Sequence, residues 1–234
     1  MVQENLCRDK PAEDWSGTTA SAGWESITPM DQLRKPTLVA LFVLGAVAPI
    51  LIMLLAPQPP TRQWWRDGAV ALGFLGFALM GWQFVPMAWM PFLTETFGTG
   101  TLIQWHSDLS LVALYLVLAH PLVLMIGNPR YLVAFNVLTG VGRLRSGVVA
   151  LLLTLVIVAT CLWRRRLNLR RRPWRWLHDL LAAAIMGFAL HHVLRVGYYT
   201  FLPLQRWLWI GYVAVWGILV AYTRGSAELA RAER

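Results

Sequence analysis

The sequence predicts an all-α integral membrane protein, a six-helix transmembrane bundle, and its composition and apolar pattern carry that prediction. Hydrophobic residues make up 57% and charged residues 14% of the 234 positions, whereas soluble domains carry about 25% charged residues. The apolar residues also gather in stretches that approach the ~20 residues a helix needs to cross a bilayer. These stretches are residues 36–56, 67–90, 104–126, 147–163, 177–196 and 207–222.

Tryptophan placement supports the same spans. The chain has 13 tryptophans, and aromatic side chains are enriched where transmembrane helices meet the headgroup layer. Many of them lie where a predicted span begins or ends, namely Trp64, Trp65, Trp105, Trp163, Trp174, Trp176, Trp207 and Trp209. We interpret them as membrane anchors. The two cysteines, Cys7 and Cys161, have no spacing typical of a disulfide framework or a metal site.

The basic residues predict the orientation of the bundle. Between the fourth and fifth spans, the stretch WRRRLNLRRRPWRW is rich in arginine, and such loops stay on the cytoplasmic side. Both termini then lie in the cytoplasm, and the third and fifth spans run parallel, from inside to outside. The net charge of +9 is distributed as such topology signals, so we expect no nucleic-acid partner. The expected location is the lipid bilayer of a bacterial inner (plasma) membrane.

We expect three regions along the chain. Residues 1–33 are polar and lack the basic start and apolar core of a cleavable signal peptide, so they are predicted to form a flexible cytoplasmic tail. Residues 34–224 form the transmembrane domain. Residues 225–234 are expected to be a short cytoplasmic tail.

All five histidines lie in two of the predicted spans. His106 and His120 are 14 residues apart, which corresponds to about 21 Å of helix rise and returns to within about 40° of the same helix face. In the fifth span, His191 and His192 follow His178 by 13 and 14 residues. Because the two spans are parallel, the histidines form two cross-helix pairs, one at the cytoplasmic depth and one at the outer depth.

This arrangement predicts that the histidines hold metal cofactors. Polar side chains inside the bilayer are costly and usually functional. Zinc requires a compact tetrahedral group of nitrogen and sulfur ligands, whereas a bis-histidine haem needs one imidazole on each side of a flat macrocycle. Helix bundles readily provide that geometry, and no carboxylate has the Glu-x-x-His spacing of a di-iron site. We therefore expect two stacked haems between the third and fifth spans.

The same residues resemble a known family. The histidine spacings, the six-span plan, LVLAHPL in the third span, and LHDLL followed by ALHHVL in the fifth span are similar to the ferric-reductase-type transmembrane domain. That family includes ferric-chelate reductases, NADPH oxidases and the membrane haem subunit of the bacterial methionine sulfoxide reductase system. The resemblance covers approximately residues 65–222, and it implies one or two b-type haems (haem b) between the third and fifth spans.

Carried over by position, the resemblance implies that His106 and His178 hold the inner haem and that His120 and one residue of the doublet hold the outer haem. NADPH-oxidase-like members use a 13-residue step, which favours His191, whereas an ideal helix favours the 14-residue step to His192. The residue not used either bonds a haem propionate or faces a neighbouring helix. The expected iron ligands are His106, His120, His178 and His191.

Several charged groups allow two interpretations each. Asp108 and Asp179 follow the inner histidines, and each either orients an imidazole or accepts a proton, or simply faces the wet interface. Arg195 follows His191 by one helical turn, so it either pairs with a haem propionate or extends to the headgroups. The arginines of the outer loops either attract anions such as ferric chelates or bind anionic lipid. They are Arg62, Arg66, Arg130, Arg143, Arg145, Arg195 and Arg206.

Two haems at two depths predict transmembrane electron transfer of the ferric-reductase type. The acceptor outside would be a ferric chelate, oxygen or a periplasmic reductase. No G-x-G-x-x-G motif follows a predicted strand, and LTGVGRLRSG lies between two spans, so it is not a dinucleotide fingerprint. FAD and NAD(P)H are therefore expected only in a flavin-containing reductase partner or a missing domain, unless quinol is the electron donor.

Two other functions remain open from the sequence. One is a haem-bearing membrane anchor subunit that feeds electrons to a periplasmic reductase of the methionine sulfoxide reductase type, which a co-purifying soluble molybdoenzyme would identify. The other is a transporter or channel that contains no haem and uses its histidines as proton relays. This last function predicts a colourless protein.

Overall fold

The computed structural model describes residues 29–57, 61–88, 90–136 and 142–232, which contain helices and no β-strand. Six helical spans are long and apolar enough to cross a membrane. They are α1 (Pro29–Leu55), α2 (Trp64–Trp82) with the short α3 (Phe84–Met87), α5 (Thr99–Gly127), α6 (Gly142–Trp163), α7 (Arg171–Arg195) and α8 (Pro203–Ala232). The predicted all-α, six-helix membrane bundle is confirmed.

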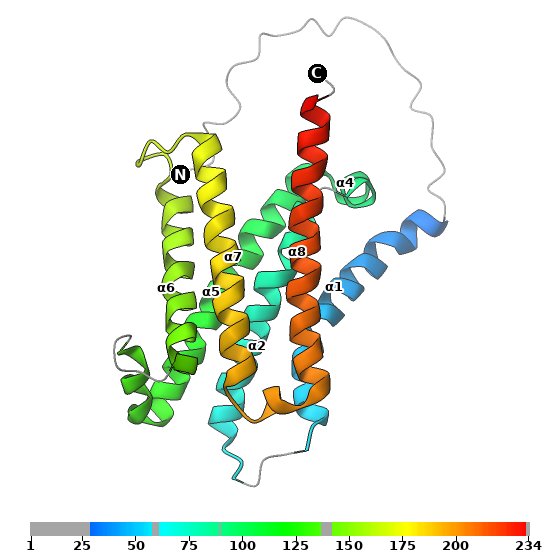
Figure 1. Ribbon diagram of the computed structural model, residues 1–234. Helices are drawn as coiled ribbons and strands as arrows, with labels where there is room; N and C mark the ends of the chain where they lie inside the picture. The colour runs from blue at the N-terminus through cyan, green and yellow to red at the C-terminus, as the bar shows by residue number, and fades with distance from the viewer. Residues whose placement is uncertain (1–28, 58–60, 89, 137–141, 233–234) are drawn as a thin grey trace, which may run out of the picture.

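The helices run up and down through the bundle in chain order (Figure 1). Residues 164–170 and the C-terminal part of α8 lie at one end, which we call the arginine-loop end, and α4 (Pro91–Phe97) lies near it. Two short 3-10 helices, η1 (Pro129–Phe135) and η2 (Tyr199–Phe201), lie at the opposite end. The histidine-bearing helices α5 and α7 consequently run in the same direction, as the sequence predicts.

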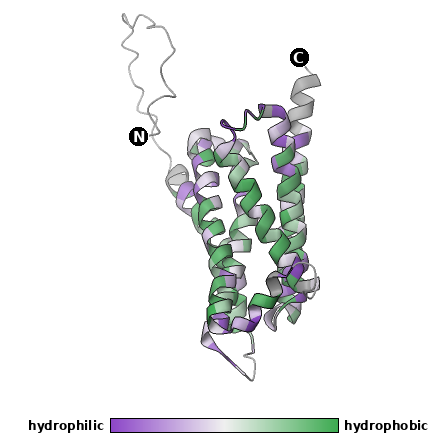
Figure 2. Cartoon of the chain, turned by 90° about the vertical axis from the view of Figure 1, so that its left-hand side faces the viewer, coloured by the Kyte–Doolittle hydropathy of each residue, from purple (hydrophilic) through white to green (hydrophobic). Residues whose placement is uncertain are grey.

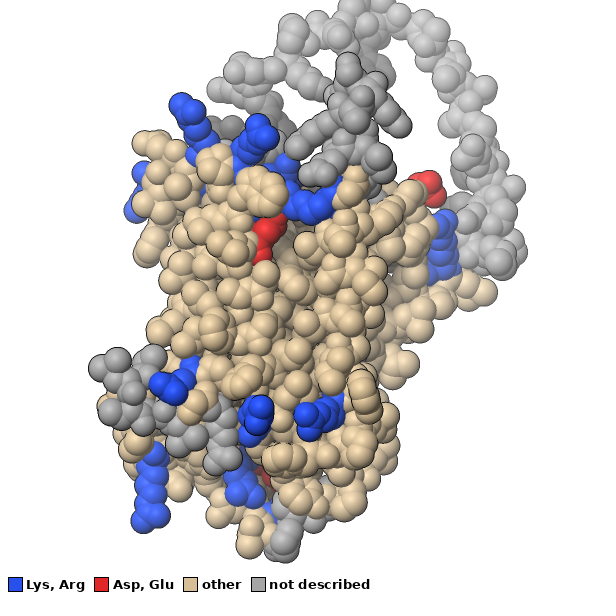
Figure 3. Space-filling view, viewed as in Figure 1, with Lys and Arg blue, Asp and Glu red and all other residues tan. Residues whose placement is uncertain are grey.

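The described surface is that of a membrane protein. Hydrophobic residues follow the middle of the helices, and hydrophilic residues gather near the two ends (Figure 2). On the face that Figure 3 shows, Lys and Arg likewise lie toward both ends of the bundle, and a broad zone without them separates the ends. Large apolar side chains in this zone are exposed, among them Leu111, Leu155 and Ile218. A bilayer would cover such a surface.

Small residues and aromatic rings pack the interior. A Cβ at Gly76 of α2 would lie 2.7 Å from Cγ2 of Val117, so this glycine allows α2 and α5 to approach closely. Trp209 of α8 is fully buried, with ring centroids 5.3 Å from Phe74 and 5.0 Å from Phe77. Since Phe74 and Phe77 also line the main cavity, α8 supports one wall of that cavity from behind.

A proline explains the break between α2 and α3. Pro86 has no backbone N–H, so the carbonyl of Trp82, four residues earlier, loses its helical partner. Accordingly α2 ends at Trp82, and Gln83 lies at the break before α3. At this break the carbonyl oxygen of Gln83 lies within hydrogen-bond distance of a side chain from α5, as described below.

The helix bounds differ from the predicted regions at both ends. Residues 1–28 of the predicted tail lie outside the described residues, and α1 begins at Pro29, inside the range predicted as tail. At the other end α8 continues to Ala232. Beyond Gly225 this segment is rich in Ala, Glu, Leu and Arg, which are all good helix formers.

Candidate functional site

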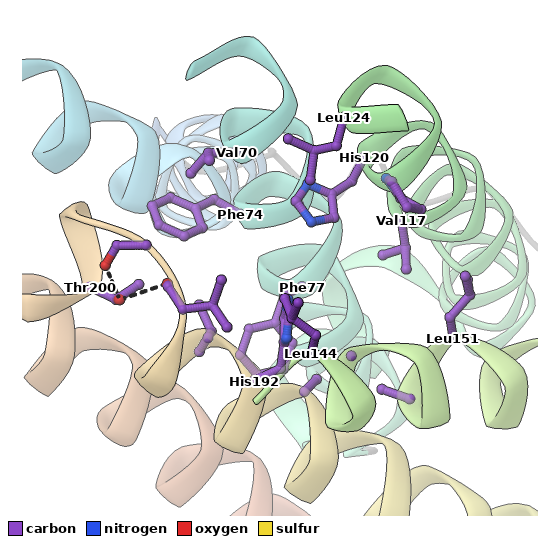
Figure 4. Close-up of a pocket in the computed structure, with 18 of the residues that line it drawn as sticks. Val70, Phe74, Phe77, Val117, His120, Leu124, Leu144, Leu151, His192 and Thr200 are labelled. Carbon is purple, nitrogen blue, oxygen red and sulfur yellow. Dashed lines mark hydrogen bonds between the residues drawn. The ribbon is translucent and has the colours of Figure 1, made fainter. Parts of the chain in front are cut away.

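Two histidine pairs connect α5 and α7. At the arginine-loop end, the ring centroids of His106 and His178 lie 6.4 Å apart. Toward the opposite end, the ring centroids of His120 and His192 also lie 6.4 Å apart, and these two side chains lie across a cavity from one another (Figure 4). The two interplanar angles are similar, 64° and 73°. The structure thus repeats one arrangement at two depths of the bundle.

The ring of His120 is oriented by the backbone of α2. Its Nδ1 lies 2.6 Å from the carbonyl oxygen of Ala69. A carbonyl only accepts hydrogen bonds, so Nδ1 carries the hydrogen and donates it. The other ring nitrogen, Nε2, then has a free lone pair, which is the state in which histidine binds a metal.

His106 is oriented in the same way at the other level. Its Nδ1 lies 3.0 Å from the carbonyl oxygen of Gln83, at the break between α2 and α3, so Nδ1 donates and Nε2 is again available. The ring of Phe84 packs edge-on at 6.1 Å. The ring orientation of both α5 histidines therefore depends on a backbone carbonyl, that of Ala69 in α2 and that of Gln83 just after α2.

His178 has a different neighbour. Its Nδ1 lies 3.6 Å from Sγ of Cys161, and the ring of Trp174 lies 5.4 Å away. A thiol is a weak donor and a weak acceptor, so this contact fixes the tautomer of His178 less strictly than a carbonyl would.

Two glycines make room for the second pair of rings. A Cβ at Gly73 of α2 would lie 2.9 Å from Nδ1 of His120. A Cβ at Gly147 of α6 would lie 2.7 Å from Cε1 and Nδ1 of His192. Any larger residue would therefore displace one ring of the pair or the helix beside it.

The cavity around His120 and His192 has a volume of about 380 Å³ and is enclosed by α2, α5, α6 and α7, with residues from η1 and η2. This volume is within the ~300–1,000 Å³ range of small-molecule sites. Its walls in the membrane zone are mostly apolar, including Phe74, Phe77, Val117 and Leu151 (Figure 4). Its polar lining gathers at the opposite end, from Arg66, Asp67, Tyr131, Tyr198, Tyr199 and Thr200.

A buried carboxylate organises that polar end. Asp67 is 6% exposed, and its Oδ2 accepts a hydrogen bond from Nε of Arg62 at 3.0 Å. Tyr199 is buried beside it, and burial together with the negative charge of Asp67 and a hydrogen bond to it raises the pKa of Tyr199 above its ordinary value. The tyrosine is therefore neutral at physiological pH and donates to the carboxylate.

The two neighbouring histidines, His191 and His192, have different surroundings. His192 faces His120 and lines the main cavity, whereas Nδ1 of His191 lies 3.0 Å from Oγ of Ser146 in α6. The family-based expectation favoured His191 as the outer ligand, and the ideal-helix step favoured His192. In the structure, the ring that lies beside that of His120 belongs to His192. The rotation of α7 about its axis follows from these two contacts with α6, Ser146 to His191 and Gly147 beside His192.

The charged residues considered with the histidines lie outside the pairs. Arg195 is exposed at the C-terminal end of α7, and Arg66 lines the cavity instead. Asp179 forms an ion pair with Arg224 of α8, and Asp108 is exposed.

Sequence reasoning did not single out Gly73, Gly147 or Gln83 as site residues. Small residues inside a span were a signal for the glycines, but only the fold reveals which ring each one faces.

The donor set fits a planar macrocycle held from two sides better than it fits a compact metal site. Among the described residues, no three His, Cys, Asp or Glu side chains come together as metal ligands. A metal held by one imidazole nitrogen on each side at about 2 Å places the ring centroids about 6 Å apart, close to the spacing of 6.4 Å in both pairs. The two oriented Nε2 atoms and the two glycines are consistent with that arrangement.

Comparison with known protein families gives a match over the histidine-bearing part of the chain. The model of a family described as "Ferric reductase like transmembrane component" matches residues 72–189. This range is half of the chain and includes His106, His120 and His178, while His191 and His192 lie two and three residues beyond its end. No curated protein and no solved structure matches the chain. Proteins with this domain generally bind haem and work with FAD and NADPH partners. The chain belongs to the ferric reductase like transmembrane component family and is an integral membrane oxidoreductase component.

Proposed function

We propose that this protein carries single electrons across the membrane through two b-type haems, one at each histidine pair. The observation that carries the proposal is the repeated cross-helix pair, with ring centroids 6.4 Å apart at both depths. One such pair could be a structural contact between helices. Two matched pairs on parallel helices, in a chain of this family, favour two equivalent cofactors over two separate structural contacts.

The chain's own residues have defined roles in this proposal. His106 and His178 ligate the inner haem, and His120 and His192 ligate the outer haem. The haem supplies the one-electron chemistry, and the protein supplies ligation, spacing and a low-dielectric surrounding. Carbonyl groups of Ala69 and Gln83 hold the α5 imidazoles in the ligating tautomer.

The proposed direction of electron transfer rests on the side of the membrane where the arginine-loop end lies. Arginine-rich loops stay in the cytoplasm, so His106 and His178 lie on the side where electrons enter. The 14 residues between His106 and His120 correspond to about 21 Å along α5, most of the ~30 Å hydrocarbon thickness. Electrons leave near His120 and His192 toward a ferric chelate, oxygen or a periplasmic reductase.

The electron donor is proposed to be a flavin-containing reductase with FAD and NAD(P)H, or quinol. The arginine loop offers a basic docking surface for an acidic protein partner. Its exposed side chains include Arg165, Arg166 and Arg170. Docking there would be weakened by salt, because exposed charges are screened over about 10 Å at 0.1 M ionic strength.

The first test is the haem content of the protein purified in mild detergent. A dithionite-reduced minus oxidised spectrum with a pyridine haemochrome count should give two b-type haems per chain. Replacing His106 or His178 by alanine should remove one haem and leave the other. A colourless wild-type protein would contradict the proposal and return the histidines to a proton-relay or structural role.

A further inference from the structure

A second cavity opens at the surface between α6 and α7. Its volume is about 660 Å³, and it is much more open than the cavity around His120. Four of its lining residues belong to α6 and four to α7. They are Gly142, Arg145, Ser146 and Val149 from α6, and Ala184, Gly187, Phe188 and His191 from α7. We call this surface the α6–α7 groove.

The groove is polar at one end only. Arg145 is exposed, and a guanidinium nitrogen lies 3.6 Å from the position of a Cβ at Gly142, so the side chain lies back over the first turn of α6. Nδ1 of His191 bonds Ser146 at 3.0 Å. The opposite ring nitrogen, Nε2, has no hydrogen-bond partner among the described residues. None of the described residues that line the groove is acidic.

The rest of the groove is apolar and lies deeper in the membrane zone. Val149 is one helical turn further along α6 than Arg145, and Phe188, Gly187 and Ala184 precede His191 along α7, in the same inward direction. A Cβ at Gly187 would meet no atom within 4 Å, so the groove is open at this glycine. The groove thus combines cationic and hydrogen-bonding groups near the headgroup depth with an open apolar channel at the acyl-chain depth.

We propose that the α6–α7 groove binds one anionic phospholipid molecule. Its phosphate oxygens accept hydrogen bonds from the Arg145 guanidinium and from the His191 ring, and one acyl chain lies along Val149 and over Gly187. Guanidinium groups suit phosphate because their planar donors bind two oxygens at once. The excess of cationic over acidic lining favours an anionic lipid over a zwitterionic one. This site does not depend on haem at the histidine pairs.

Two substitutions test the polar and apolar parts of the groove separately. Arg145→Ala removes the cation, and Gly187→Leu places a larger side chain in the apolar channel, at a position where a Cβ meets no atom within 4 Å. Arg206→Ala removes an exposed arginine of α8 outside the groove, and Gly217→Leu fills open space elsewhere on α8. The full chain in mild detergent is titrated with phosphatidylglycerol and, separately, with phosphatidylcholine, and bound lipid is counted by native mass spectrometry.

The wild type and both control variants should retain one phosphatidylglycerol in preference to phosphatidylcholine. Arg145→Ala should weaken phosphatidylglycerol binding about fivefold, because one basic residue near a membrane surface contributes about that much. Gly187→Leu should weaken binding of both lipids. Arg145→Lys should have an effect between those of the wild type and Arg145→Ala, because it keeps the charge but loses the two-oxygen contact of the guanidinium. Soluble glycerol phosphate should not compete, since it lacks the acyl chain.

Three results would overturn the proposal. Equal retention of the two lipids by the wild type would remove the charge argument. Wild-type affinity in both Arg145→Ala and Gly187→Leu would show that the lipid binds elsewhere. Displacement of phosphatidylglycerol by an uncharged isoprenoid quinone, unaffected by Arg145→Ala, would assign the groove to a different ligand. Circular dichroism of each variant checks that the helices are intact.

Discussion

The imidazole of His120 lies so close to Gly73 that a Cβ at position 73 would come within 2.9 Å of Nδ1. The same Nδ1 lies 2.6 Å from the carbonyl oxygen of Ala69, one turn earlier in α2. Ala69 thus accepts the hydrogen of this ring, and Gly73 leaves the space for it. The orientation of a candidate ligand on α5 therefore depends on α2, a helix that contains no histidine.

Gly73→Ala and Gly147→Ala should each impair the outer haem site. Forcing extra atoms into a packed site costs about 1–3 kcal/mol, which corresponds to at least about fivefold weaker haem binding. The expected result is loss of part of the outer-haem spectrum with the inner haem retained. Gly211→Ala is the matched control, because a Cβ there meets nothing within 4 Å. Full haem content in both cavity variants would contradict the role of the glycines.

The doublet gives the sharpest test of ligand identity. His192→Ala should remove the outer haem, because His192 is the residue whose ring faces His120. His191→Ala should leave two haems, since His191 contacts Ser146 instead. The haemochrome count and the low-temperature reduced spectrum distinguish the two variants. Loss of a haem in His191→Ala alone would instead support the 13-residue step of the NADPH-oxidase-like members.

Arg66 and Arg195 are the two candidates for pairing with a haem propionate. Arg66 lines the cavity and Arg195 does not, so Arg66 is the better partner for a haem propionate. A hydrogen bond to a charged group contributes about 1.5–3 kcal/mol, so Arg66→Ala should weaken retention of the outer haem by at least about tenfold. Arg195→Ala should have little effect. The measurement is haem loss to an apo-haem acceptor protein, and equal loss rates would argue against this choice.

The contribution of Tyr199 to stability should be measurable at alkaline pH. Its pKa is raised above the ordinary 10.0 by burial and by Asp67, so the neutral form is stabilised in the folded protein. That contribution to stability is fully present below the ordinary pKa and is lost as pH rises through the raised value. Wild type should therefore lose thermal stability above about pH 10 more steeply than Tyr199→Phe. Parallel curves for the two proteins would show that Tyr199 does not contribute.

Hydropathy and helical periodicity were enough to predict the bundle. A span needs about 20 apolar residues whatever its neighbours are, so the six spans are readable without tertiary information, and the structure has them. The level of each histidine within the bundle is similarly local, because helix rise is constant along α5 and α7. The match of residues 72–189 to the family model confirms the resemblance inferred from the histidine framework.

Only the tertiary structure decided which neighbour of each histidine orients it and which member of the doublet faces α5. His191 and His192 differ by about 100° around the helix axis, and either could face α5 for some rotation of α7. That rotation depends on packing against α6, where Ser146 bonds one ring and Gly147 leaves room for the other. The position of Arg66 in the cavity is equally non-local. The sequence by itself determined the spans and the histidine levels, since both follow from distances along one helix, whereas contacts between helices depend on side-chain shape at every packed surface.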